Sequence, residues 1–346
     1  MPSILSIGTA LPEFNYSTSD VEDIGKNWLK NDDLLLQQFS RFVKSSKVQN
    51  RRFVIPKEEI LNLGGLRNRA SIFEESGVLL GESSILDAIR NSNTQLSDLD
   101  CMVFTSCSCP TIPSIDGQLV NRLGLNRNIT RVPIFQYGCA GGVAGLALAS
   151  KLTESHNFVC LSSVEICSMV FQPQNFNPAQ LVGSAIFADG SASVILSKIE
   201  KGLTIRATRS FLIPNSRELM GYSILDDGFH LLLDKSLPQK LIEIAPDIIE
   251  SFLKENSLER TDVDYWLFHP GGIKILDFLE NALEIPYEKC RWSRETLYSI
   301  GNVSSATVLF VIKRFLEETK LKKGDKVILL GIGPGLTIEL ILFEWA

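Results

Sequence analysis

The chain has 346 residues, 45% of them apolar, and carries 34 basic and 40 acidic side chains, a formal net charge of −6. This length is roughly twice the ~150 residues of a typical domain, so we expect two core-forming units or one large duplicated fold, and the apolar content excludes a disordered chain. The chain lacks a long basic run, which argues against a nucleic-acid partner and favours small molecules. No apolar run reaches the ~18 residues that a membrane span requires.

Seven cysteines and three histidines bear on location and metal binding. The cysteines are Cys101, Cys107, Cys109, Cys139, Cys160, Cys167 and Cys290. An odd count, without a secretory signal at the N-terminus, predicts a cytoplasmic protein with reduced thiols. Neither a CxxC nor an HxxxH pair occurs, so we expect no metal site. We interpret the close pair Cys107 and Cys109 as buried small hydrophobic residues.

Short β-type runs alternate with helix-type stretches along the chain. We expect strands at 3–8, 100–105, 132–135, 158–162, 191–196, 265–268 and 326–330. This alternation predicts an α/β architecture. Residues 97–106 and 261–270 each run from an Asp-x-Asp turn into a buried strand. We interpret them as equivalent positions in two halves of a duplicated fold; two unrelated but similar turns are the alternative.

Residues 31–52 contain an amphipathic helix pattern that leads into a basic loop with Lys47, Arg51 and Arg52. This loop is the largest local positive cluster of the chain. A solvated helix end and a phosphate-binding loop explain it equally well.

Cys139 follows the strand-like run RVPIFQYG and precedes the small-residue helix pattern AGGVAGLALASKL. The pattern predicts that Cys139 lies at a helix N-terminus. There the helix dipole and the unpaired backbone N–H groups favour a thiolate, the form that a cysteine nucleophile needs. A structural cysteine in a packed glycine-rich helix is an equally good interpretation of this segment alone.

His269 comes directly after a buried strand and before a Gly-Gly turn. This places an imidazole at the C-terminal end of a strand, where α/β folds bind their ligands. A lone histidine is more often an ordinary core or surface residue, and we interpret His156 as such a surface residue.

Two further segments carry polar groups or glycines. Asn302 precedes an apolar helix pattern, which it could cap. The glycine run at 331–335 follows a strand but opens into more strand-like sequence, which argues against a nicotinamide-binding fingerprint. A cysteine, an imidazole, a carboxamide and a glycine loop are together the groups that nucleophilic acyl transfer requires.

Several motifs resemble those of the type III polyketide synthases, the chalcone-synthase-like branch of the thiolase superfamily. They are CAGG at Cys139, FADG at Phe187, DGFH at Asp227, HPGG at His269, GNVSSA at Gly301 and GIGPGLTIE at Gly331. The resemblance spans nearly the whole chain. It implies an α/β duplicated thiolase fold with five layers, αβαβα, whose halves are residues 1–200 with the nucleophilic cysteine and residues 201–346 with the histidine and asparagine.

The resemblance also implies an activity. A homodimer would load an acyl-CoA starter on Cys139, extend it with malonyl-CoA and cyclise the product, without a bound cofactor or a carrier domain. His269 would ion-pair with Cys139, and Asn302 would act with His269 on the malonyl thioester oxygen as carbon dioxide leaves. The oxyanion would be met by the backbone N–H of Cys139 and one from the 331–335 loop.

Further positions follow from the same resemblance. Phe187 and Phe229 match the two gating phenylalanines, and Ile112 matches a residue that enters the partner's cavity across the dimer interface. The cavity wall is expected at Cys107, Ser108, Glu165, Cys167, Val170, Gly183, Ser304 and Pro334, and contacts with coenzyme A at Lys47, Arg51, Arg52, Gly271 and Gly272.

The substrate class is suggested by departures from the plant members. Plant enzymes tend to carry threonine where this chain has Cys107, Cys167 and Val170, so a flavonoid-type activity is disfavoured. The chain is more similar to bacterial members that make alkylpyrones or alkylresorcinols from fatty acyl-CoA starters. The alternatives are a ketoacyl synthase III-like enzyme that performs one condensation and a catalytically silent thiolase-fold partner subunit.

Overall fold

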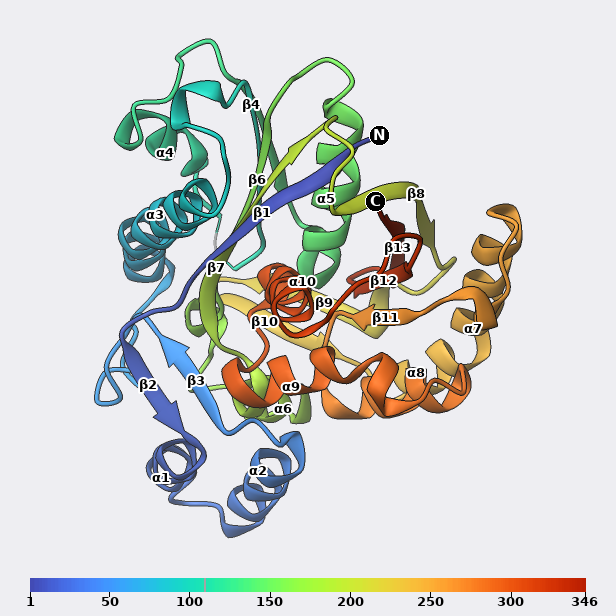
Figure 1. Ribbon diagram of the computed structural model, residues 1–346. Helices are drawn as coiled ribbons and strands as arrows, with labels where there is room; N and C mark the ends of the chain where they lie inside the picture. The colour runs from blue at the N-terminus through green and yellow to red at the C-terminus, as the bar shows by residue number, and fades with distance from the viewer. Residues whose placement is uncertain (109) are drawn as a thin grey trace.

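The computed structural model describes residues 1–108 and 110–346 (Figure 1). The helices are α1 (Thr18–Trp28), α2 (Asp33–Ser46), α3 (Leu66–Arg90), α4 (Asp116–Arg122), α5 (Gly141–Leu152), α6 (Pro178–Ile186), α7 (Leu237–Glu255), α8 (Ile273–Ala282), α9 (Arg291–Ile300) and α10 (Thr307–Glu318). The strands are β1 (Ser3–Ala10), β2 (Phe14–Ser17), β3 (Asn50–Phe53), β4 (Cys101–Ser106), β5 (Thr130–Phe135), β6 (Val159–Ile166), β7 (Asp189–Ser197), β8 (Leu203–Leu212), β9 (Met220–Leu225), β10 (Gly228–Leu233), β11 (Tyr265–Phe268), β12 (Lys326–Gly333) and β13 (Thr337–Trp345). Every strand expected from the sequence is present.

The large sheet consists of two similar parts. Its strand order is β11-β12-β13-β8-β1-β7-β6-β4-β5, and β1 joins β8 through only two residue pairs. On one side of this junction the order is β1, antiparallel β7, antiparallel β6 and parallel β4. On the other side it is β8, antiparallel β13, antiparallel β12 and parallel β11. The strands β4 and β11 therefore occupy matching positions, as the repeated Asp-x-Asp turns predict.

The two Asp-x-Asp turns make the same contacts. Asp98 and Asp262 each accept the backbone N–H three residues earlier at 2.8 Å and so close a short 3₁₀ turn. Asp100 accepts the backbone N–H of Phe158, just before β6, at 3.0 Å. Asp264 accepts that of Lys326, the first residue of β12, at 2.9 Å. The second aspartate of each turn thus fixes the strand that lies parallel to its own.

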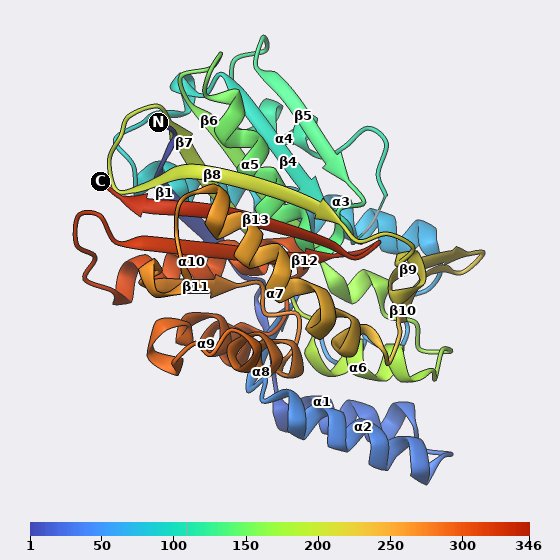
Figure 2. The same cartoon turned by 90° about the vertical axis from the view of Figure 1, so that its right-hand side faces the viewer.

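Helices separate and cover the two parts of the sheet. In Figure 1, α3 lies on one outer side, α5 and α10 lie in the middle, and α7 lies on the opposite side. Figure 2 shows α7, α8 and α9 along the face formed by β8 and β11–β13. Three separate clusters of buried apolar side chains fill the spaces between these layers. This is the five-layered αβαβα arrangement that the resemblance implies.

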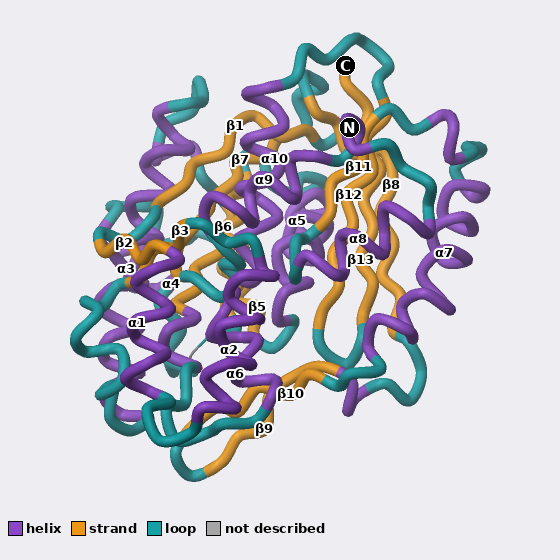
Figure 3. Tube along the Cα trace, turned by 90° about the horizontal axis from the view of Figure 1, so that it is seen from below, coloured by secondary structure: helices purple, strands orange, loops and turns teal. Residues whose placement is uncertain are grey.

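A second, smaller group of elements lies outside these layers. The helices α1 and α2 pack together, and α2 contacts α6, as Figure 3 also shows. Residues 50–53, expected to belong to a basic loop, instead form β3, which pairs antiparallel with β2. In the part of the chain that the structure describes, no helix is both long and apolar enough to cross a membrane.

Candidate active site

Cys139 lies at the N-terminal end of α5, where the sequence places it. The 3₁₀ turn Gly138–Ala140 continues directly into the helix. Gly138 has φ +53°, and a Cβ there would lie 2.4 Å from the ring of Pro334. A Cβ on Gly142 would lie 2.1 Å from the carbonyl oxygen of Ser305. Glycines therefore allow the Cys139 turn to pack against the loop after β12 and the turn before α10.

His269 follows β11 directly and is 3% exposed. Its backbone N–H donates to the carbonyl oxygen of Leu330 at 2.8 Å, which fixes the chain at the edge of β12. Neither ring nitrogen has a hydrogen-bond partner among the residues described. A Cβ on Gly271 would lie 3.7 Å from the imidazole ring, so this glycine keeps space beside it. Both ring nitrogens remain available to a substrate.

Asn302 holds the turn before α10 through its side-chain oxygen and still presents a donor. Its Oδ1 accepts the backbone N–H of Ser304 at 2.9 Å and the Thr307 hydroxyl at 3.2 Å. Its Nδ2 lies 3.4 Å from the carbonyl oxygen of Gly271, in the loop that follows His269. The predicted cap of α10 is therefore wrong, since Ala306 stands at the N-cap of that helix and the Asn302 oxygen instead holds the turn before it. Because that oxygen is occupied, the NH₂ group must face the His269 loop.

Burial acts against an ion pair between Cys139 and His269. It raises the pKa of the Cys139 thiol to about 11 and lowers the pKa of the His269 imidazole to about 4. Both shifts favour the neutral form, since removal from water disfavours charge. Burial therefore opposes the ion pair that the resemblance implies, whereas the position of Cys139 at a helix N-terminus favours the thiolate.

Hydrogen bonds to the buried carboxyl group of Glu165 form one wall of the candidate site, near Cys139. Glu165 accepts the backbone N–H of Cys107 at 3.0 Å and the hydroxyl of Ser305. Ser108 Oγ accepts the backbone N–H of Ile166 at 2.9 Å. Burial raises the pKa values of both Glu165 and Cys107. The structure brings these predicted wall residues together, whereas Cys109 lies outside the described residues.

A second wall is the 3₁₀ turn Cys167–Val170. Asp189 holds this turn in place, since its carboxylate accepts the backbone N–H of Ser168 at 2.8 Å and that of Val54 at 3.0 Å. Burial raises the pKa of Asp189 to about 7.

The hairpin β9–β10 carries one predicted gate residue and one residue that the sequence analysis missed. Phe229 is 6% exposed, and its ring meets that of Tyr222 edge to face at 5.9 Å. The Tyr222 hydroxyl is buried, and its pKa is raised by burial and by the nearby Cys107 and Cys167. Tyr222 therefore belongs to the site. Pairing of β9 with β10 was the missing information, because it places Tyr222 on the same side as Phe229.

An apolar cavity of about 60 Å³ lies beside the second wall. It is lined by Tyr16, Val21, Ile24, Trp28, Phe39, Phe53, Ile60, Cys167, Ser168, Val170, Phe171, Gln180, Gly183, Ser184, Phe187 and Leu231. The predicted residues Cys167, Val170, Gly183 and Phe187 form one part of this lining. The aromatic residues of α1, α2 and β3 were not predicted, because their membership depends on how α1 and α2 dock.

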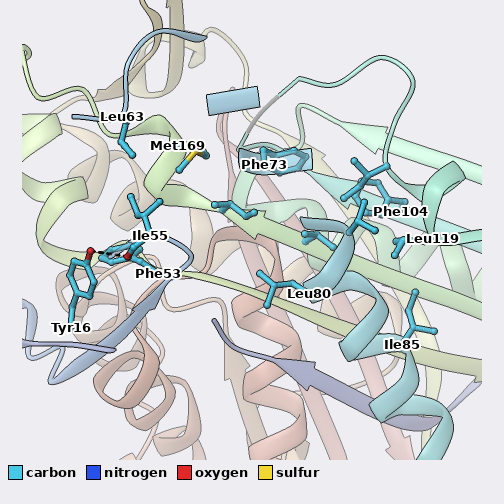
Figure 4. Close-up of a cluster of buried hydrophobic side chains, with 14 of the residues drawn as sticks. Tyr16, Phe53, Ile55, Leu63, Phe73, Leu80, Ile85, Phe104, Leu119 and Met169 are labelled. Carbon is cyan, nitrogen blue, oxygen red and sulfur yellow. Dashed lines mark hydrogen bonds between the residues drawn. The ribbon is translucent and has the colours of Figure 1, made fainter. Parts of the chain in front are cut away.

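The polar groups of this cavity are already paired. The Tyr16 hydroxyl donates to the carbonyl oxygen of Ile55 at 3.0 Å, and Figure 4 shows the Tyr16 ring beside that of Phe53. Trp28 Nε1 donates to the carbonyl oxygen of Pro173 at 2.7 Å. With these groups occupied, the cavity offers an occupant mainly apolar contacts.

The three basic residues predicted to contact coenzyme A separate in the structure. Arg51 is 1% exposed and donates to the carbonyl oxygen of Ser184 at 3.1 Å, so it does not reach a surface phosphate. Lys47 is exposed, and Arg52 is half-buried and donates to the carbonyl oxygen of Glu13 at 2.7 Å. The error arose because residues 50–53 form a strand, in which neighbouring side chains point to opposite faces. Arg51 is therefore withdrawn from the predicted binding set.

The remaining predicted positions are near the surface. Gly272 has open space beside its Cα. Ile112 is 99% exposed, an unusual position for a large apolar side chain in the chain as described. Among the described residues, no cluster of His, Cys, Asp and Glu side chains is arranged to hold a metal ion.

Comparison with known proteins identifies the family. The model of the chalcone and stilbene synthases, N-terminal domain, matches residues 1–198, and that of their C-terminal domain matches residues 195–345. A 1,3,6,8-tetrahydroxynaphthalene synthase of Streptomyces peucetius subsp. caesius is 30% identical, covering 99% of this chain and 93% of that protein. A phloroglucinol synthase of Pseudomonas fluorescens is 30% identical, covering 88% of each chain. The crystal structure of 1,3,6,8-tetrahydroxynaphthalene synthase from Streptomyces coelicolor A3(2) superimposes with a TM-score of 0.94 at 27% identity, covering 99% of both chains. The chain therefore belongs to the chalcone and stilbene synthase family and is an acyltransferase of the type III polyketide synthase class with the thiolase fold.

Proposed function

We propose that Cys139, His269 and Asn302 carry out the condensation. The Cys139 thiol gives its proton to His269 as its sulfur attacks the starter thioester, and the departing coenzyme A takes that proton. The His269 ring has no hydrogen-bond partner among the residues described, and the Asn302 NH₂ group lies beside the loop after His269. This supports donation of one N–H from each residue to the malonyl thioester oxygen. These bonds would stabilise the enolate formed when carbon dioxide leaves. The enolate carbon then attacks the acyl group on Cys139.

We further propose that the starter has an apolar acyl chain whose tail enters the cavity beside Cys167 and Phe187. The observation that carries this proposal is the apolar lining of a cavity of about 60 Å³. One water-sized group needs ~10–15 Å³, so the cavity has room for roughly four such groups. About the last four carbons of a medium-length chain fit this space, whereas a palmitoyl tail would require neighbouring side chains to move.

A series of saturated acyl-CoA starters from acetyl to palmitoyl tests this substrate class. We expect the specificity constant kcat/KM to be highest for a medium-length starter. The reason is that each CH₂ group transferred from water to the cavity contributes about 0.8 kcal/mol. Products would be identified by mass spectrometry beside a Cys139→Ala control. A maximum at acetyl or malonyl, with no gain from added methylenes, would overturn the acyl-tail proposal.

The products identified in this experiment also show which type of ring the enzyme forms. We propose an alkylpyrone or alkylresorcinol, which the apolar cavity supports, although the related enzymes named above are synthases of hydroxylated aromatic compounds without an alkyl chain. Cys139-dependent products with two or more extender units fit this proposal. Products that stop after one extension would instead favour a ketoacyl synthase III-like activity, and no product with any starter would favour a silent partner subunit.

We also propose a cytoplasmic homodimer in which Ile112 enters the partner's cavity. The exposure of this isoleucine, 99%, supports the proposal, since burial against a second copy would remove its side chain from water. We expect sedimentation velocity to give about twice the monomer mass of 38.4 kDa. A monomer at micromolar concentration would contradict the homodimer.

Two further expectations belong to the proposed function. The chain divides into halves at residues 1–200 and 201–346, and coenzyme A contacts Lys47, Arg52, Gly271 and Gly272.

A further inference from the structure

The hydroxyl of Ser304 lies between two cysteine sulfurs. Its Oγ is 3.6 Å from Cys139 Sγ and 3.2 Å from Cys107 Sγ. Ser304 has φ +45°, a conformation that side-chain-bearing residues rarely adopt, and its backbone N–H is held by Asn302 Oδ1 at 2.9 Å. The Asn302 contact holds the Ser304 backbone in this conformation, in which the side chain reaches both sulfurs. Strain of this kind in an active site is a reason to look for a function.

Only one proton is available on this hydroxyl, so it cannot donate to both sulfurs at once. In the ranges 1–108 and 110–346, Ser304 provides the one side-chain hydrogen bond to Cys139 Sγ. Cys107 competes for it from the other side, and its own backbone N–H is held by Glu165. The hydroxyl therefore turns toward whichever sulfur is the better acceptor, and an anionic sulfur is a better acceptor than a neutral one.

We propose that Ser304 is a catalytic residue whose hydroxyl donates to the Cys139 thiolate during acyl transfer and returns to Cys107 when Cys139 carries the acyl chain. This inference rests on the proposed role of Cys139 and adds a second group that touches the reacting sulfur. During loading, the bond from Cys139 Sγ to the acyl carbon forms and the bond from that carbon to the sulfur of coenzyme A breaks. The Cys139 proton passes through His269 to the departing thiolate, while the Ser304 proton remains on its own oxygen.

The surroundings of Cys139 make such a donor necessary. The titratable group whose charge raises the pKa of the Cys139 thiol is Glu165, which also raises the pKa of the neighbouring Cys107. Burial already opposes the thiolate. A donated hydrogen bond lowers the pKa of the thiol and partly offsets both effects.

The test is the rate at which iodoacetamide alkylates Cys139, measured in Ser304→Ala against pH. Because Cys139 alone among the described cysteines is not fully buried, peptide mass spectrometry can follow it separately. Between about pH 7 and pH 9, we expect the logarithm of the alkylation rate to rise with pH in parallel with the wild type, at a rate about threefold to tenfold lower. The rate is lower because less thiolate forms, and the higher nucleophilicity of each thiolate offsets only part of this loss. Release of coenzyme A in a single turnover should slow likewise.

Two further variants distinguish this role from general damage. Ser193→Ala removes a buried serine hydroxyl that is bonded to Ser84 and Ser162, away from Cys139, and should leave the alkylation rate unchanged. Cys107→Ala removes the competing acceptor and should raise the rate. Equal rates in the wild type and in Ser304→Ala, or a lower rate in Cys107→Ala, would overturn the inference. If Ser304→Ala is unaffected while wild-type product formation still depends on Cys139, this inference alone fails and the proposed function stands.

Discussion

Replacing His269 with alanine is expected to reduce polyketide formation by about 10²–10³-fold, the usual effect of removing one donor to a developing oxyanion. The ring is 3% exposed, and none of the residues described uses either of its nitrogens, so its loss removes an interaction with substrate rather than a structural bond. Product formation and malonyl-CoA decarboxylation would be measured separately. Both should fall, because the enolate forms in the decarboxylation step.

Two Asn302 variants separate the role of the NH₂ donor from that of the side-chain oxygen. Asn302→Asp keeps an oxygen to accept the Ser304 N–H and the Thr307 hydroxyl but lacks the NH₂ donor, whereas Asn302→Ala loses both. We expect both variants to lose condensation to a similar extent, and both to lose thermal stability, Asn302→Ala through the lost acceptor and Asn302→Asp through a buried carboxyl group facing the Gly271 carbonyl. Unchanged product formation by His269→Ala, or by Asn302→Asp, would exclude the proposed role of that residue.

Gly183→Val is expected to abolish the preference for a medium-length starter while leaving short starters active. A Cβ at Gly183 would already lie 2.8 Å from Leu231 and 3.1 Å from the Phe187 ring, so the branched side chain must occupy the cavity. Exclusion of about four methylene groups costs about 3 kcal/mol, or roughly 10²-fold in kcat/KM. Acetyl-CoA and octanoyl-CoA would be compared in the wild type and in the variant.

A graded control accompanies this variant. Gly183→Ala adds only the Cβ and should give an intermediate loss with octanoyl-CoA. Alkylation of Cys139 by iodoacetamide should be the same in all three proteins, since Gly183 has no contact with that sulfur among its nearest neighbours. An unchanged ratio of octanoyl to acetyl activity in Gly183→Val would show that the starter tail lies elsewhere.

The three proposed catalytic residues each occupy the end of a regular element, and their places in the fold were predictable from the sequence for this reason. Cys139 precedes a small-residue helix, His269 follows a short apolar strand, and Asn302 precedes an amphipathic helix. Local pattern predicts such positions in the fold, whereas the roles of the three residues came from the family resemblance. The repeated Asp-x-Asp turn also indicated the duplication, since the same aspartate contacts recur before β6 and at the start of β12.

What the sequence analysis missed depends on contacts between distant elements. Arg51 was expected to contact coenzyme A because the basic loop resembles the family's phosphate-binding cluster, but the pairing of β3 with β2 turns it inward. Tyr222 and the aromatic lining of the cavity depend on the docking of the β9–β10 hairpin and of α1 and α2. The ionisation of Cys139 likewise depends on distant contacts, since its helix position favours a thiolate whereas burial, which no local pattern reports, opposes it.

Trapping the acyl-enzyme tests the central claim most directly. The protein would be mixed with octanoyl-CoA, digested and examined by peptide mass spectrometry, and a second sample would then receive malonyl-CoA. The account predicts one octanoyl group on the Cys139 peptide and its disappearance into product after malonyl-CoA is added. An octanoyl group on Cys107 or another residue, or an adduct on Cys139 that malonyl-CoA does not remove, would contradict it.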